Sequence, residues 1–133
     1  MILMKIMHSK QSGEGEVREL GPYQIESLVS PTEEGALTAY RVRIEPEQRT
    51  NESYHKIAEE CYYVIEGSGL AVLDDQEYRL EVGDFLRLPP GTRHRFETGE
   101  AALVMLDLHC PGSRPDRDVY FTDEAPEGFT DLG

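Results

Sequence analysis

Apolar and polar residues alternate along the middle of the chain with a period of two. The clearest example places four side chains on one face of a short segment and charged or small residues between them: Thr38, Tyr40, Val42 and Ile44. Because successive side chains of a β-strand point to opposite faces, this alternation predicts a strand buried on one side. Pro46 has no backbone N–H to donate, so we expect the strand to end there.

Further segments rich in β-branched and aromatic residues follow, and turn signals separate them. Asp74-Asp75-Gln76-Glu77 predicts a hairpin turn, and Gly67-Ser68-Gly69 predicts the end of a strand. The expected strands are residues 36–45, 61–66, 70–73, 78–80, 85–88, 94–98 and 101–110. About seven or eight short strands, without a convincing amphipathic helix, predict an all-β sandwich or barrel, and a jelly-roll barrel hides its edges well.

The chain has 133 residues, which is enough for one domain with a real core. We expect a single domain over residues 1–133, with a barrel core from about 22 to 110. Residues 1–21 form an N-terminal arm in this interpretation. Residues 111–133, rich in proline and acidic side chains, form a tail that wraps or frays.

The composition excludes several classes of partner. A net charge of −13 repels phosphate backbones and anionic membrane surfaces, so we expect neither nucleic acid nor a membrane as partner. Two cysteines, Cys61 and Cys110, are too few for a disulfide framework. The apolar start, Met1–Met7, is interrupted by Lys5 and lacks the features of a signal peptide, which favours a cytoplasmic protein.

Candidate chemistry lies in two histidines and a glutamate. If the strand faces that carry them all point into the barrel, His55, Glu60 and His94 converge. Two imidazoles and a carboxylate suit a divalent first-row metal with open positions for water, O₂ or substrate, and zinc uses the same ligands. On the same faces, Tyr62 and Phe96 are expected to line the pocket.

Two spaced motifs carry a resemblance to a known family. Residues 53–69 are similar to the first cupin motif, G-x5-H-x-H-x3-4-E-x6-G, and residues 83–98 resemble the second, G-x5-P-x-G-x2-H-x3-N. The matching residues are His55, Glu60, Gly67, Gly83, Pro89, Gly91 and His94. The resemblance covers roughly residues 36–110 and implies a double-stranded β-helix, that is, a cupin jelly-roll barrel.

In that family the two histidines of the first motif, the glutamate and the histidine of the second motif bind a metal. The resemblance therefore implies a divalent ion (Fe, Mn, Ni or Zn) held by His55, Glu60 and His94. The first histidine of the motif falls on Ser53, and a hydroxyl is a poor substitute for imidazole. Three alternatives follow: water takes the place of the missing histidine, another side chain such as Glu52 or Asn51 takes it, or the site binds no metal.

Three further expectations concern residues outside the motifs. Tyr40 is expected in the core or the pocket wall, and Glu60 is expected to need a cationic partner if it is buried. Asp107 and His109 share a face of the last strand with Leu103, and a solvated strand end is the preferred interpretation over a place at the pocket rim. The apolar N-terminal segment and the family resemblance favour a homodimer.

The motifs leave the function open between classes. One hypothesis is a metal-dependent enzyme acting on a sugar derivative, a phenolic or an organic acid, with dioxygenation, isomerisation or decarboxylation as possible chemistries. A second is a non-enzymatic cupin that binds a small molecule, which the serine at position 53 favours. A third is a structural barrel with a vestigial site, against which an intact Glu60 argues.

Overall fold

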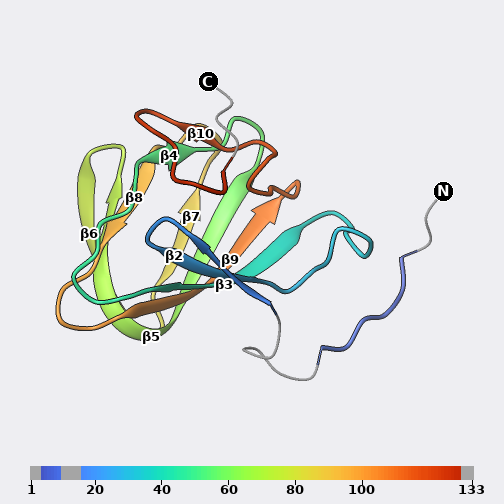
Figure 1. Cartoon of the computed structure of the whole chain (residues 1–133), viewed down its shortest axis with the longest axis horizontal. Helices are drawn as coiled ribbons and strands as arrows, with labels where there is room; N and C mark the ends of the chain where they lie inside the picture. Colours follow the sequence, from blue (N-terminus) through green and yellow to red (C-terminus); the bar gives the residue numbers. More distant parts are fainter. Residues whose placement is uncertain (1–3, 10–15, 130–133) are drawn as a thin grey trace.

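The computed structural model describes residues 4–9 and 16–129. Figure 1 shows their ten strands as an antiparallel sheet that curls into a barrel. The strands are β1 (Val17–Leu20), β2 (Tyr23–Ser27), β3 (Thr38–Ile44), β4 (Ser53–Tyr54), β5 (Glu59–Leu73), β6 (Gln76–Glu81), β7 (Phe85–Leu88), β8 (His94–Glu97), β9 (Leu103–Cys110) and β10 (Tyr120–Phe121). The predicted all-β jelly-roll class is confirmed. Within residues 4–9 and 16–129, no helix is long and apolar enough to cross a membrane.

Strand β5 organises the barrel because it belongs to both of its halves. Its first part pairs with β9 on one edge and with β7 on the other, and its second part pairs with β6 and β8. The sheet then runs in the order β1-β2-β3-β9-β5-β8-β4-β10. Segments far apart in sequence therefore lie side by side in the sheet, as β3 does beside β9 and β5 beside β8 (Figure 1).

The strand end predicted at Gly67–Gly69 is wrong, since β5 continues through these residues to Leu73. The register shifts between Val64 and Glu66, which is a β-bulge that bends the strand. Gly67 has φ of 77°, and a Cβ atom there would lie 1.7 Å from the carbonyl oxygen of Ala102. The glycine thus permits a close approach of two backbones rather than ending the strand.

The hairpin turn predicted over Asp74-Asp75-Gln76-Glu77 is confirmed at its first two residues, while Gln76 and Glu77 already belong to β6. Leu73 pairs with Gln76, so the loop between β5 and β6 has two residues. Both have positive φ, 47° for Asp74 and 71° for Asp75, which is typical of the type I′ turn that matches the twist of a hairpin. Aspartate is one of the few residues besides glycine that adopt this conformation at modest cost.

The hydrophobic core fills the barrel from inward-facing side chains of several strands. Five of its members are 0% exposed: Ile44, Val64, Phe96, Leu103 and Met105. Their alternation along β3, β5 and β9 follows the period of two seen in the sequence. Burial of these large side chains supplies most of the free energy that holds the sheet closed.

Both ends of the chain extend the barrel beyond the expected core. Strand β1 lies within the predicted arm and pairs with β2 along its whole length. After β9 the tail wraps over one end of the barrel, where β10 pairs with β4. Figure 1 shows this tail crossing the opening of the barrel, while residues 4–9 lie away from it.

Candidate metal centre

Four polar side chains meet inside the barrel because of strand register. Glu60 on β5 stands directly opposite His109 on β9, and Ser53 on β4 stands opposite His94 on β8. Paired residues project to the same face of a sheet, so each pair points into the cavity together. His55 follows β4 and reaches the same point. All five side chains are buried.

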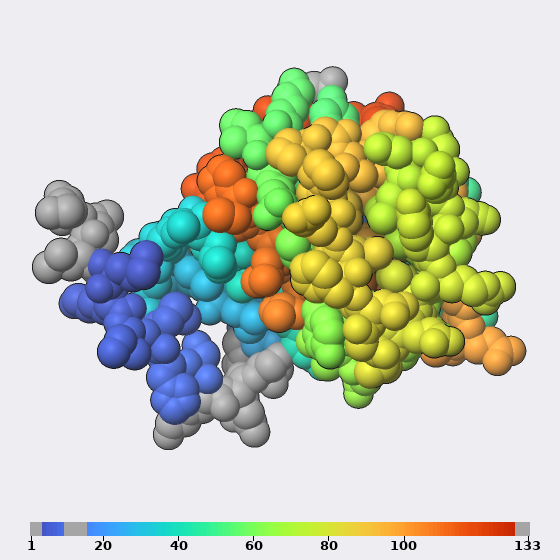
Figure 2. Space-filling model, turned by 180° about the vertical axis from the view of Figure 1, so that it is seen from behind, coloured from blue at the N-terminus to red at the C-terminus, as the bar shows by residue number. Residues whose placement is uncertain are grey.

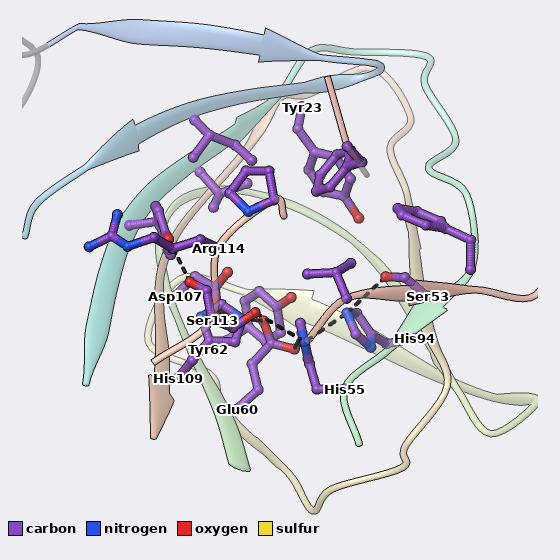
Figure 3. A pocket seen from close by; sticks show the side chains of 17 residues that line it. Tyr23, Ser53, His55, Glu60, Tyr62, His94, Asp107, His109, Ser113 and Arg114 are labelled. Atoms are coloured by element: carbon purple, nitrogen blue, oxygen red, sulfur yellow. Dashed lines mark hydrogen bonds and ion pairs between the residues drawn. The ribbon is translucent and has the colours of Figure 1, made fainter. Parts of the chain in front are cut away.

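The carboxylate of Glu60 is the centre of this group. Its Oε1 lies 3.2 Å from Nε2 of His55 and 3.3 Å from Nε2 of His94. Its Oε2 lies 2.7 Å from Nε2 of His109. Figure 3 shows these side chains gathered on one side of the cavity, with Tyr23 across from them.

Backbone carbonyls fix two of the imidazoles by their other nitrogen. Nδ1 of His55 lies 2.5 Å from the carbonyl oxygen of Asp118, and Nδ1 of His94 lies 3.2 Å from that of Thr92. A carbonyl only accepts, so in each ring Nδ1 carries the proton and donates. When the ring is neutral, the lone pair of Nε2 then faces Glu60, which is the tautomer that a metal-binding histidine needs.

Asp118 supports this arrangement from the tail. Its carboxylate accepts hydrogen bonds from the backbone N–H groups of three successive residues, Lys56, Ile57 and Ala58. The residue itself is buried and has φ of 60°, a conformation that non-glycine residues seldom adopt. The side chain thus holds the loop between β4 and β5 while its carbonyl orients His55.

Burial and mutual charge set the protonation of the group. Burial alone would raise the pKa of Glu60, but His109, His94 and His55 together hold that pKa well below its usual range. Burial, and then the neighbouring Glu60, raises the pKa of Asp107 well above the usual range. The site therefore combines a carboxyl whose pKa is lowered, Glu60, with one whose pKa is raised, Asp107.

The pKa values of His55 and His94 are shifted in opposite directions. Burial lowers the pKa of His55, but Glu60 outweighs it and the net pKa is raised. For His94, burial outweighs the carboxylate, so the pKa is lowered and the ring is neutral near pH 7. Burial also raises the pKa of Tyr62 well above 10, and that phenol remains protonated.

The buried side chains around Glu60 leave polar atoms unpaired, and a bound metal ion would satisfy some of them. In the part of the chain that the structure describes, three buried side-chain atoms have no hydrogen-bond partner: Glu60 Oε1, Asp107 Oδ1 and His109 Nδ1. Leaving such atoms without a partner is costly in a buried site. One ligand atom each from His55, Glu60 and His109 lies within 4.8 Å of the others. Two imidazole nitrogens and a carboxylate oxygen suit a divalent first-row metal.

A cavity opens above these residues. It encloses about 560 Å³, including open solvent at its mouth. The group around Glu60 forms one side, and apolar or aromatic side chains such as Ile25, Val42, Phe121 and Phe129 form much of the rest. A polar end within an apolar chamber is typical of a site that binds a small organic molecule.

The structure brings the predicted residues His55, Glu60 and His94 together. Tyr40 and Tyr62 line the cavity. Phe96, also predicted to line it, is instead fully buried, and its ring packs edge-on against Tyr62 at a centroid distance of 5.0 Å. It supports the wall from behind rather than forming its surface.

The two side chains considered as replacements for the missing histidine lie elsewhere. Asn51 donates to the backbone carbonyl of Glu124. Glu52 accepts a hydrogen bond from Thr122 and faces Arg93. Both line a separate surface groove, and neither lines the cavity of the histidines.

The interpretation of Asp107 and His109 as a solvated strand end is wrong. Asp107 is 7% exposed and His109 is 5% exposed, and both line the cavity. The period of two already placed them on the face of Leu103 and Met105, which lie in the core. What the pattern did not reveal is the tail, whose buried Ser113 and Val119 line the same cavity as Asp107 and His109.

Comparison with known proteins identifies the family. A model of the cupin domain matches residues 40–109. Protein SchB of Streptomyces halstedii is 34% identical over 107 residues, covering 77% of this chain and 78% of that protein. The tetracenomycin polyketide synthase protein TcmJ of Streptomyces glaucescens is 30% identical over 104 residues, covering 75% of this chain and 70% of that protein. The chain belongs to the cupin family.

A solved structure supports the fold over most of the chain. The polyketide cyclase RemF from Streptomyces resistomycificus superposes with a TM-score of 0.74 at 24% sequence identity. The match covers 91% of this chain and 90% of that one. The similarity of fold extends beyond residues 40–109, which the family model matches.

Proposed function

We propose that the protein is a metal-dependent cupin enzyme that acts on a small organic molecule. The observation that carries the proposal is the convergence of His55 and His94 on Oε1 of Glu60, at 3.2 and 3.3 Å. That oxygen is buried without a hydrogen-bond partner, although two Nε2 atoms face it. A divalent ion bound between them would use all three atoms. Iron, manganese, nickel and zinc all accept this set.

The residues of the chain would do the remaining work. A bound ion would supply Lewis-acid or redox chemistry. Glu60, held ionised by the surrounding histidines, balances its charge. Tyr62 stays protonated because its pKa is raised well above 10, so its phenol offers a hydroxyl hydrogen to an oxygen atom of a substrate. The raised pKa of Asp107 favours the protonated form of that carboxyl as well. The apolar walls exclude water from the reacting group.

The substrate that the cavity favours is a mostly apolar, oxygen-bearing ring compound of the polyketide type. Aromatic side chains on the wall, among them Tyr23, Tyr40 and Phe121, suit a flat ring system. The names of TcmJ, a polyketide synthase protein, and RemF, a polyketide cyclase, support the same class. Cyclisation, isomerisation, decarboxylation and dioxygenation all remain within the chemistry of such a site.

Elemental analysis of untagged protein tests the metal directly. We expect near-stoichiometric iron, manganese, nickel or zinc in the wild type and its loss in the double variant His55→Ala/His94→Ala. The variant His8→Ala, which removes an exposed histidine outside the cavity, is the matched control. A wild type that holds no metal even after reconstitution would exclude the proposed enzyme class.

One observation favours a second function, a metal-free cupin that binds a small molecule without reaction. The 2.7 Å contact between His109 Nε2 and Glu60 Oε2 compensates the buried carboxylate without any ion. In that case small phenolic ligands would raise the melting temperature of protein treated with a chelator. Stabilisation that requires added metal would count against this function.

We also propose a cytoplasmic homodimer. Met4 and Ile6 are 74% and 101% exposed, so the N-terminal segment has apolar side chains that its own barrel does not cover. Figure 2 shows residues 4–9, in dark blue, at one edge of the molecule. Tyr63 and Phe85, paired on β5 and β7, are also exposed. Such surface is typical of an interface. Light scattering should give the mass of two chains, and a monomer mass would overturn the proposal.

A further inference from the structure

We propose that His109, on β9, supplies the third imidazole of the metal site in place of the histidine that the cupin motif would carry at residue 53. The inference rests on the proposed function, because it concerns how the same site holds its ion. It assigns a ligand outside both motifs. It also explains how a chain with Ser53 retains a buried glutamate and three buried histidines.

The geometry favours His109 more than any other side chain. Its Nε2 lies 2.7 Å from Oε2 of Glu60, closer to that carboxylate than either motif histidine. The set of ligand atoms within 4.8 Å of one another consists of His55, Glu60 and His109. The rings of His55 and His109 lie edge to face with centroids 4.6 Å apart. His109 therefore stands where a ligand to the same ion would stand.

Strand register makes this position stable. His109 pairs with Glu60 on one side and with Thr38 of β3 on the other, so its backbone is held at the centre of the sheet. Its ring packs against Tyr40 at a centroid distance of 5.8 Å. A ligand on a central strand is held more rigidly than one on a loop. Among the described residues Nδ1 of His109 has no hydrogen-bond partner, and its Nε2 faces Glu60.

The residue at the motif position, Ser53, reaches the site with a hydroxyl only. The hydroxyl of Ser53 lies 3.4 Å from Nε2 of His94, and Ser53 pairs with His94 across β4 and β8. Ser53 is short and lines the cavity. An imidazole at this position would fill the space beside His94. With the imidazole moved to β9, that side of the ion is open to water or substrate.

Cobalt(II) binding tests the assignment, because both its affinity and its visible absorption bands report the ligands. Removal of a group that only hydrogen-bonds to a metal ligand costs about 10–100-fold in metal affinity. Loss of a ligand itself in His109→Ala should therefore lower the affinity for cobalt by at least about 100-fold and change the absorption bands. In Ser53→His/His109→Ala the imidazole returns to the motif position, and affinity should recover. His8→Ala should match the wild type.

A measurement on the wild type guards against variants that fold poorly. In protein labelled with ¹⁵N at histidine and titrated with zinc, the Nε2 resonance of His109 should move together with that of His55. Two results would overturn this inference alone. One is that folded His109→Ala binds cobalt as well as the wild type does. The other is that zinc leaves the Nε2 resonance of His109 unmoved in protein that binds zinc. Wild type that binds neither ion would overturn the proposed function.

Discussion

The carbonyl oxygen of Asp118 lies 2.5 Å from Nδ1 of His55, so a residue of the tail orients a histidine of the barrel. The carboxylate of the same aspartate accepts from three backbone N–H groups, those of Lys56, Ile57 and Ala58. One residue therefore fixes both the loop and the ring. The site is complete only when the tail is in place.

Replacement of Asp118 by alanine should destabilise the protein and loosen His55. Three backbone N–H groups, of which that of Ala58 is buried, would lose their acceptor, which should lower the free energy of unfolding by about 2–4 kcal/mol. Urea unfolding measures this loss. The exposed Asp123 provides the control, since Asp123→Ala removes the same charge from the tail. Equal stability of the two variants would contradict the role given to Asp118.

Replacement of Glu47 by glycine should stabilise the protein. Glu47 occupies the opening glycine position of the first cupin motif and has φ of 59°, which strains a residue with a Cβ atom. Relief of that strain should exceed the entropy that glycine gains in the unfolded state and add about 0.5–1 kcal/mol. Thermal unfolding should show a higher melting temperature. Glu47→Ala removes the same charge but keeps the strain, so a gain in that variant would point to charge instead.

Replacement of Gly67 by alanine should be among the most damaging single changes. A Cβ atom there would lie 1.7 Å from the carbonyl oxygen of Ala102, and φ is 77°. We expect a loss of at least about 3 kcal/mol in the free energy of unfolding. Gly83 also has a positive φ, 94°, but a Cβ atom would have no neighbour within 4 Å. Gly83→Ala should therefore cost only the backbone strain, about 1–2 kcal/mol.

The ion pairs of Glu34 should give a stability that depends on pH. Its carboxylate accepts from Arg114 at 2.8 Å and from Arg117 at 2.6 Å, joining the loop before β3 to the tail. Burial would raise the pKa of Glu34, but the two arginines hold it below its usual value. A depressed pKa in the folded state stabilises the protein above the pKa of the unfolded state, and the effect is lost as pH falls through the folded pKa.

The variant Glu34→Gln should therefore be less stable than the wild type by about 1 kcal/mol at pH 7, and the difference should shrink between about pH 5 and 3. Thermal unfolding at several pH values gives the comparison. Glu33→Gln, next to it in the sequence, provides the control because Glu33 accepts from the hydroxyl of Ser30 instead. A constant difference across the pH range would exclude the ion pairs as its cause.

The alternation of apolar and polar residues predicted most of the barrel because, within each strand, the apolar residues lie on the face that is buried. The period of two in β3 and the residue pair Asp74-Asp75 gave a strand and a turn that the structure bears out. The continuity of β5 was missed because Gly67 has two roles in proteins, to end a strand or to permit a close approach. Only the position of Ala102, 35 residues further along by number, decides between them.

Local pattern also explains which residues of the candidate site could be predicted. Residues His55, Glu60 and His94 were found because motif spacing and strand parity agree for them. His109 carries the same parity signal, but it lies outside both motifs, so motif spacing gives it no support. A contact between Asp118 and His55, 63 residues apart, leaves no trace in local periodicity.

The tail has a consequence for how such a barrel changes over time. Val119, Phe121 and Phe129 form part of the cavity wall, yet none of them belongs to β5, β8 or β9, which carry Glu60, His94 and His109. Substitutions at these three positions reshape the chamber that a ligand meets and leave the pairings of those three strands as they are. The choice of ligand is thereby free to diverge faster than the framework that holds the chemistry.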